Sequence, residues 1–147
     1  MTHLPAGRQG LAQIRYYIVE KHMENFPFKN ETFQLIGVCM EVHRLLGHGF
    51  LEIVYKDAVE YEARQKDLQY SREREYLIEY KNIILPHKLF ADFVFFDSII
   101  LEVKAAEEGI SSVFISQLLN YLKASRCKVG LIINFGKTKL EYKRLIL

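Results

Sequence analysis

The chain has 147 residues, of which 50% are apolar and 26% charged, with two cysteines and a net charge of +2. This composition indicates one globular domain and excludes a disordered chain or a disulfide scaffold. No apolar run approaches the ~20 residues that cross a bilayer and no signal-peptide core is present, so we expect a cytoplasmic protein without membrane contact and with free thiols.

The first half of the chain predicts a tail followed by two helices. Residues 1–27 lack a clear period and are assigned to a tail or optional helix, while residues 28–147 form the expected domain. Asn30 is the expected N-cap of a first helix that reaches about Leu46. The apolar stripe expected on this helix is Leu35, Val38, Val42 and Leu45. A second helix is expected from about Leu51 to Gln65, after two glycines.

The second half predicts strands around one further helix. Ser111 or Ser112 is expected to cap a helix that ends near Ser125 and crosses over between two parallel strands. Pro86 is expected to interrupt the second strand. The expected strands are Glu75–Tyr80, Ile83–Leu85 resuming as Leu89–Phe96, Ile99–Ala105, Lys128–Phe135 and Leu140–Leu147. The order ααβββαββ predicts an α/β (α+β) fold, with helices packed against a central mixed sheet.

A hairpin in the middle of the chain brings polar residues into an apolar segment. Its turn is expected at Asp97-Ser98, and Glu102 and Lys104 then project from one face of the second strand. Asp92, on the partner strand, can join Glu102 on that face. Two convergent carboxylates suit Mg²⁺ or Mn²⁺. The structural alternative is an exposed Glu–Lys pair, with Lys104 bridged to Glu102 or to the glutamates that follow it.

Positive charge collects near the C-terminal end. Residues 123–147 contain seven lysines and arginines and one glutamate. Such a region suits a polyanion beside a carboxylate site, and it equally suits a sheet edge protected by lysines. Five histidines are present without zinc spacing, and His43 is interpreted as a helix residue with a local hydrogen bond.

Asp92 followed by Glu102-Val103-Lys104 resembles the metal-binding core of the PD-(D/E)XK nuclease superfamily, whose core has an αβββαβ order. Gly49 to Tyr55 resembles the GxxExxY sequence that names a small bacterial family within it. Gln117 and Tyr121 resemble the Q-x-x-x-Y motif of the RecB-like branch. The resemblance covers about residues 31–147, although Ala91 stands where the superfamily name has proline.

The resemblance implies a restriction-endonuclease-like core and a Mg²⁺-dependent nuclease, with Mn²⁺ as an alternative ion. Asp92, Glu102 and Glu52 would hold the metal, and Lys104, Gln117 and Tyr121 would complete the catalytic site. Without the resemblance, Glu52 is a carboxylate favoured by a helix dipole, with Tyr55 on its face, and Gln117 and Tyr121 belong to a polar stripe.

The expected partner is nucleic acid, DNA rather than RNA by superfamily prevalence. A chain with one compact site that cuts duplex is expected to act as a homodimer or to nick one strand at a time. The rival interpretation is a catalytically silent module that binds nucleic acid or protein and keeps the nuclease fold.

Overall fold

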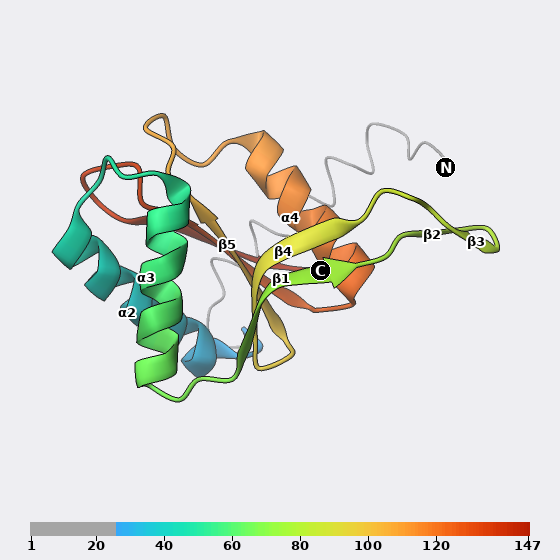
Figure 1. The fold of residues 1–147 in the computed structure, drawn as a ribbon, viewed down its shortest axis with the longest axis horizontal. Coiled ribbons are helices and arrows are strands. Elements are labelled where there is room, and N and C mark those ends of the chain that lie inside the picture. The colour runs from blue at the N-terminus through green and yellow to red at the C-terminus, as the bar shows by residue number, and fades with distance from the viewer. Residues whose placement is uncertain (1–25) are drawn as a thin grey trace.

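The computed structural model describes residues 26–147, in which three helices surround a mixed sheet (Figure 1). The prediction for residues 1–25 lies outside the described residues. The helices are α2 (Lys29–Leu46), α3 (Glu52–Gln65) and α4 (Ser112–Ser125). The strands are β1 (Tyr70–Tyr76), β2 (Glu79–Tyr80), β3 (Ile83–Ile84), β4 (Leu89–Phe95), β5 (Ile99–Lys104), β6 (Val129–Asn134) and β7 (Glu141–Ile146). The predicted mixed sheet with packed helices is confirmed.

The main sheet has five strands in the order β1-β4-β5-β6-β7. As expected, α4 crosses between the parallel strands β5 and β6, while the other neighbouring strands are antiparallel. Alternating residues of the central strands send their side chains to opposite faces. Leu101 and Leu131 meet α2 and α3, whereas Ile100 and Ile132 meet α4. The two helical layers therefore cover opposite faces of the sheet.

The first strand begins earlier than the sequence predicted. β1 covers Tyr70–Tyr76, while Glu79–Tyr80 leaves the main sheet and pairs with Ile83–Ile84 in a separate two-stranded hairpin. Four consecutive charged residues in β1, from Arg72 to Glu75, interrupt the apolar alternation by which a strand is recognised. An edge strand tolerates them because only one of its sides pairs with another strand. The β2–β3 hairpin projects away from the sheet (Figure 1).

Two details of the helix α2 prediction are wrong, and one residue assigned to the tail packs in the core. Asn30 is not the N-cap, because the helix already begins at Lys29. The N-cap residue is Phe28, which is in the left-handed region with a φ of 58° and makes no side-chain capping hydrogen bond. Leu45 is 63% exposed, because the buried face of the helix includes Ile36 and Cys39 and does not extend to Leu45. Phe26, assigned to the tail, is buried in the core. Packing thus begins before the expected domain boundary.

The turn of the central hairpin also lies one residue earlier than expected. The Ser98 N–H donates to the Phe95 carbonyl over 3.0 Å, and Phe96 and Asp97 both have positive φ, at 56° and 52°. Phe96 rather than Ser98 therefore occupies a central turn position. Within residues 26–147, no helix combines the length and apolar character needed to span a bilayer. Cys39 and Cys127 are both free and buried.

Candidate active site

The backbone ladder between β4 and β5 is replaced by side chains at Asp92 and Glu102. Regular pairing ends at Phe93 with Leu101. The next residues are Asp92 and Glu102, where the Asp92 N–H donates to Glu102 Oε1 over 3.1 Å and the Val103 N–H donates to Asp92 Oδ2 over 2.8 Å. Each carboxylate thus fixes the opposite strand. The two groups are only 8% and 3% exposed, so they are held together and largely out of water.

This geometry makes the carboxyl pair electrostatically unfavourable. Burial first, and then the charge of Asp92, raise the pKa of Glu102 to about 9. A buried carboxyl with such a pKa keeps its proton at neutral pH when no cation compensates the pair. The two carboxyl groups therefore form a site that a positive charge would stabilise.

Lys104 is held at the end of β5 by residues of α4. Its Nζ donates to Gln117 Oε1 over 2.9 Å, and Gln117 Nε2 donates to the Tyr121 hydroxyl over 3.3 Å. The ammonium also lies 4.6 Å from the centre of the Phe114 ring, within cation–π range. The expected contact between Gln117 and Lys104 is present, whereas Lys104 forms no ion pair with a carboxylate in residues 26–147.

Tyr121 lies beside the carboxyl pair as well as on α4. Its side chain is mostly buried, and burial first, followed by the charges of Glu102 and Asp92, raises the pKa of its phenol. The phenol therefore stays protonated and can donate a hydrogen bond toward the site. Gln117 and Tyr121 thus link Lys104 to the carboxyl pair.

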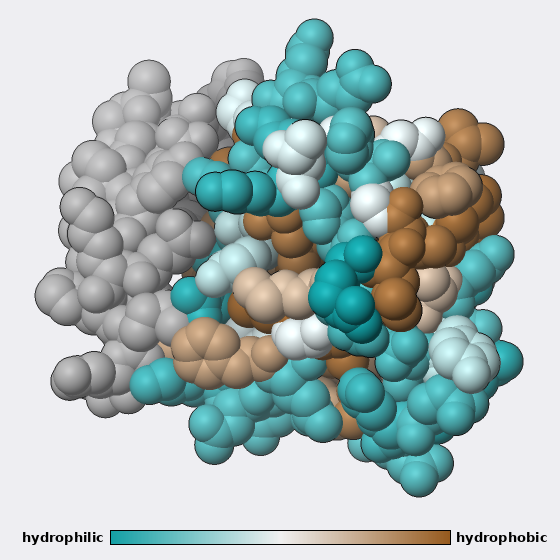
Figure 2. Space-filling model, turned by 90° about the vertical axis from the view of Figure 1, so that its left-hand side faces the viewer, coloured by the Kyte–Doolittle hydropathy of each residue, from teal (hydrophilic) through white to brown (hydrophobic). Residues whose placement is uncertain are grey.

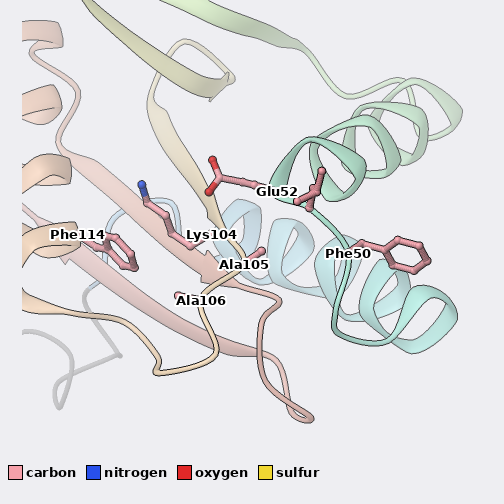
Figure 3. A pocket seen from close by; sticks show the side chains of 7 residues that line it. Phe50, Glu52, Lys104, Ala105, Ala106 and Phe114 are labelled. Carbon is pink, nitrogen blue, oxygen red and sulfur yellow. The ribbon is translucent and has the colours of Figure 1, made fainter.

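Glu52, at the start of α3, reaches the same end of the sheet. It lines a pocket of about 280 Å³ together with Lys104, and Figure 3 shows the two side chains coming from α3 and from the end of β5. Burial first, and then the charge of Asp92, raise the pKa of the half-buried Glu52 carboxyl, while Lys104 and Lys56 oppose this shift. Asp92 and Glu102 do not line this pocket.

The mouth of this pocket is apolar. Phe50 and Leu51, next to Glu52, belong to its lining and are 49% and 76% exposed. Figure 2 views the molecule from the side of α2 and α3 and shows apolar surface gathered in patches among polar side chains. The pocket therefore offers a charged interior with an apolar rim.

Sequence reasoning missed two residues at this site, Lys56 and Glu73. Lys56 Nζ donates to Asp92 Oδ1 over 3.0 Å and also pairs with Glu73. Burial lowers the pKa of Lys56, but the hydrogen bonds and charges of Glu73 and Asp92 outweigh it and raise the value overall. Glu73 stands opposite Asp92 in the β1–β4 register and has a φ of 54°. This left-handed conformation, costly for a non-glycine residue, turns the glutamate out of the regular ladder.

A family model of the PD-(D/E)XK nuclease superfamily matches residues 29–145. The chain belongs to the PD-(D/E)XK nuclease superfamily. Its fold is also similar to that in the "Crystal structure of SSO0001", with a TM-score of 0.51 and 18% sequence identity over 63% of this chain. The match spans 48% of that other chain, about half its length. No curated protein matches. The expected restriction-endonuclease-like fold is confirmed.

Membership of the PD-(D/E)XK superfamily raises the question of whether these residues fit a divalent cation. Asp92 and Glu102 supply the hard oxygen ligands that Mg²⁺ and Mn²⁺ prefer, and a cation bound beside Glu102 would oppose the burial that raises the pKa of this carboxyl. Within residues 26–147, no three acidic, histidine or cysteine side chains converge as a ready metal cluster. Asp92 and Glu102 are therefore two oxygen ligands of the kind that such a cation requires, and among the described residues no third acidic, histidine or cysteine side chain converges with them.

Two predictions about the PD-(D/E)XK site are wrong in detail. The helices carrying Glu52 and Gln117 do not close over one sheet face, because α3 and α4 cover opposite faces. Only Glu52, at the start of α3, and Phe114 of α4 line the same pocket, beside Lys104 at the end of β5. Accordingly, the carboxylates of Glu52, Asp92 and Glu102 do not line one pocket together.

Tyr55 does not share the exposed face of Glu52. It is fully buried and stacks on Phe135, with ring centres 4.5 Å apart. Its hydroxyl donates to the Gly47 carbonyl over 2.8 Å and accepts from the Phe50 N–H over 3.2 Å. The tyrosine of the GxxExxY sequence thus fixes the loop that leads into Glu52.

The hydrogen bond of His43 is also not local. Its Nε2 lies 2.8 Å from the carbonyl oxygen of Lys137, which is 94 residues away. The imidazole therefore connects α2 to the loop between β6 and β7. This contact supports the interpretation of His43 as a structural residue.

Proposed function

We propose that this chain hydrolyses phosphodiester bonds of nucleic acid in a reaction that depends on Mg²⁺, or alternatively on Mn²⁺. The observation that carries the proposal is the crossed pairing of Asp92 and Glu102, which holds two carboxyl groups beside Lys104 where the ladder breaks. A fold without such chemistry would gain stability from backbone hydrogen bonds at this point. Here, two buried acids stand in their place at an electrostatic cost.

In this proposal Asp92 and Glu102 hold the metal, and Glu52 assists from the wall of the pocket. The bound cation would polarise a phosphate oxygen and activate water. Glu52, with its raised pKa, can accept a hydrogen bond from water or share a proton with it. The two buried carboxylates need little reorganisation to bind a cation, since each is already held by a backbone N–H of the opposite strand.

Lys104, Gln117 and Tyr121 act on the phosphate in the same proposal. The Lys104 ammonium stabilises negative charge that develops on the scissile phosphate. Gln117 and the Phe114 ring restrict this ammonium to one position, which lowers the reorganisation needed when substrate binds. Tyr121 orients Gln117 and presents a protonated phenol to the site.

The finer assignments extend from these residues. We place the chain in the GxxExxY family and the RecB-like branch, because Tyr55 anchors the loop before Glu52 and Gln117 contacts Lys104. DNA is the proposed substrate ahead of RNA on superfamily prevalence. A homodimer would let one site cut each strand of a duplex. A cytoplasmic location agrees with two free, buried cysteines.

The test is cleavage of end-labelled single-stranded, duplex and branched DNA and RNA with Mg²⁺, with Mn²⁺ and with EDTA. Asp92→Asn and Glu102→Gln should each abolish metal-dependent cleavage, while the exposed Glu108→Gln serves as a matched control. Cleavage that persists in EDTA, or in both site variants, would contradict the metal mechanism.

One observation favours the rival function, a silent binding module with the nuclease fold. Lys56 already places a cation on Asp92, as a tethered substitute for a metal would. If the wild-type chain binds nucleic acid but cleaves none of the substrates with either metal, this rival replaces the proposal. Restored cleavage in Lys56→Gln would show that the tethered ammonium suppresses the reaction.

A further inference from the structure

The surface along α4 contains three hollows in a row that begin at the candidate active site. The first is the pocket at Lys104 and Phe114. The second, of about 380 Å³, is lined by Gln117, Tyr121 and Asn120 of α4. The third, of about 580 Å³, begins at Asn120 and continues past Lys123. Leu89 and Asn120 line both the second and the third hollow, so these two are continuous.

The far wall of this groove comes from the β2–β3 hairpin and the start of β4. Its large apolar side chains are half exposed: Leu77 is 45% exposed, Ile84 55% and Phe90 48%. The hairpin itself contributes only two paired residues per strand and projects from the sheet (Figure 1). Large apolar groups gathered along one groove mark a site that binds a partly apolar ligand.

The charge of the groove is strongly one-sided. Lys88, Lys123 and Arg126 line it, with His87 beside them, against a single acid, Glu79. Lys88 pairs with Glu75 outside the groove over 2.8 Å. Lys123 and Arg126 form no ion pair within residues 26–147 and therefore offer their charge to a ligand. A ligand that fits is apolar along one side and anionic along the other.

We propose that this groove binds single-stranded nucleic acid and leads it to the carboxyl pair. Unpaired bases have both properties required: apolar faces that stack on Phe90 and contact Leu77 and Ile84, and phosphates that meet Lys123 and Arg126. The groove follows α4 from Phe114 to Ala124, a helical distance of about 15 Å. This inference rests on the proposed function, because it names the substrate class of the same site.

A duplex does not satisfy these contacts. Its base faces are stacked on one another and only their edges are accessible. Phe90 and the apolar side chains near the hairpin would therefore face the hydrated sugar–phosphate backbone and contact no base. A duplex would gain binding energy only from contacts to its phosphates, and the groove offers few basic side chains for such contacts. The protein should therefore prefer single strands, flaps or unpaired ends to blunt duplex.

The experiment measures fluorescence anisotropy of labelled 20-nucleotide strands, as DNA and as RNA, and of the matching blunt duplex. It uses the Glu102→Gln chain without metal, so that no cleavage occurs. We expect single strands to bind at least tenfold more tightly than duplex. Phe90→Ala should weaken single-strand binding by about 5- to 150-fold, the effect of losing one base–aromatic stack. Lys123→Ala/Arg126→Ala should reduce the salt dependence of binding.

Matched controls lie on α3, away from the groove. Tyr61→Ala removes an aromatic side chain that is 60% exposed, and Arg64→Ala/Lys66→Ala removes two surface cations. Both should bind as the parent does. Equal affinity for duplex and single strand, or unchanged binding in Phe90→Ala, would overturn the groove assignment. An Ile84→Asp substitution that converts a dimer to a monomer would instead identify the groove as an interface between copies.

The outcomes for binding and cleavage are separate. Groove variants that lose single-strand binding in a chain that cleaves no substrate would support the groove and reject the proposed nuclease function. Metal-dependent cleavage with unaltered strand preference in all groove variants would support the nuclease and reject the groove.

Discussion

Replacing Glu102 with glutamine isolates the electrostatic cost of the carboxyl pair. Glutamine keeps the volume and the oxygen that accepts from the Asp92 N–H, but it cannot ionise. In the metal-free folded chain the Glu102 pKa is raised from 4.5 to about 9. A group with a raised folded-state pKa contributes stability that is fully present below its unfolded pKa. That contribution is lost as the pH rises toward the folded value.

The magnitude follows from the difference between folded and unfolded pKa. Between pH 4.5 and 9 the unfolded carboxyl is ionised and the folded one is protonated. The free energy of unfolding then falls by ~1.4 kcal/mol per pH unit. From pH 5 to pH 8 the wild-type chain should lose at most about 4 kcal/mol relative to Glu102→Gln.

The assay is urea unfolding in EDTA at pH 5, 6.5 and 8, followed by circular dichroism because the chain has no tryptophan. Glu108→Gln, at an exposed position, should keep the pH dependence of the wild type. Mg²⁺ should raise the stability of the wild type more than that of Glu102→Gln, since binding to the folded state alone stabilises it. Equal pH dependence in wild type and Glu102→Gln would refute the reasoning, because Glu102 would then be ionised in the folded chain.

Three further predictions concern lysines and one tyrosine. Lys56→Met should lower the free energy of unfolding of the metal-free chain by about 3 kcal/mol in urea, because its buried carboxylate partner loses its countercharge. An unchanged free energy of unfolding would show that this ion pair does not stabilise the fold. Tyr55→Phe should lower the free energy of unfolding by about 1 kcal/mol, and it should lower kcat because the loop before α3 loses a hydrogen bond. An unchanged kcat would show that the hydroxyl contributes to stability alone. Replacing Lys137, Lys139 and Lys143 together should reduce the salt slope of duplex binding by up to ~0.9 per lost contact, and an unchanged slope would identify a protected sheet edge.

The chemistry of the hairpin could be read from the sequence because it is local. Side chains alternate with period two, so Glu102 and Lys104 had to share a face of β5 once the strand was recognised. The expected hairpin brought Asp92 near Glu102, but only the observed turn and the pairing of Phe93 with Leu101 set the two residues opposite each other. The spacing of Gln117 and Tyr121 on α4 is equally local, and the right-handed crossover determined the side of the sheet on which this helix lies.

Contacts between distant segments were decided by the tertiary structure. Lys56 precedes Asp92 by 36 residues, and only the packing of α3 against the sheet brings its ammonium to that carboxylate. The sole signal in the sequence was a lysine one helical turn after Glu52. Glu73 gave no signal, because its position depends on a left-handed residue inside an edge strand.

The amino-acid sequence was enough to predict the three helices, the mixed sheet and the shared face of Glu102 and Lys104, because these follow from periodicity and handedness. It did not predict the separate β2–β3 hairpin. Only the packing of distant segments placed α3 and α4 on opposite faces of the sheet, with Glu52 and Phe114 lining one pocket at the end of β5. It also decided that Tyr55 is a core residue while Glu52, three positions earlier, faces the pocket. Such outcomes depend on how buried surfaces fit together, and residues far apart in the chain specify that fit jointly.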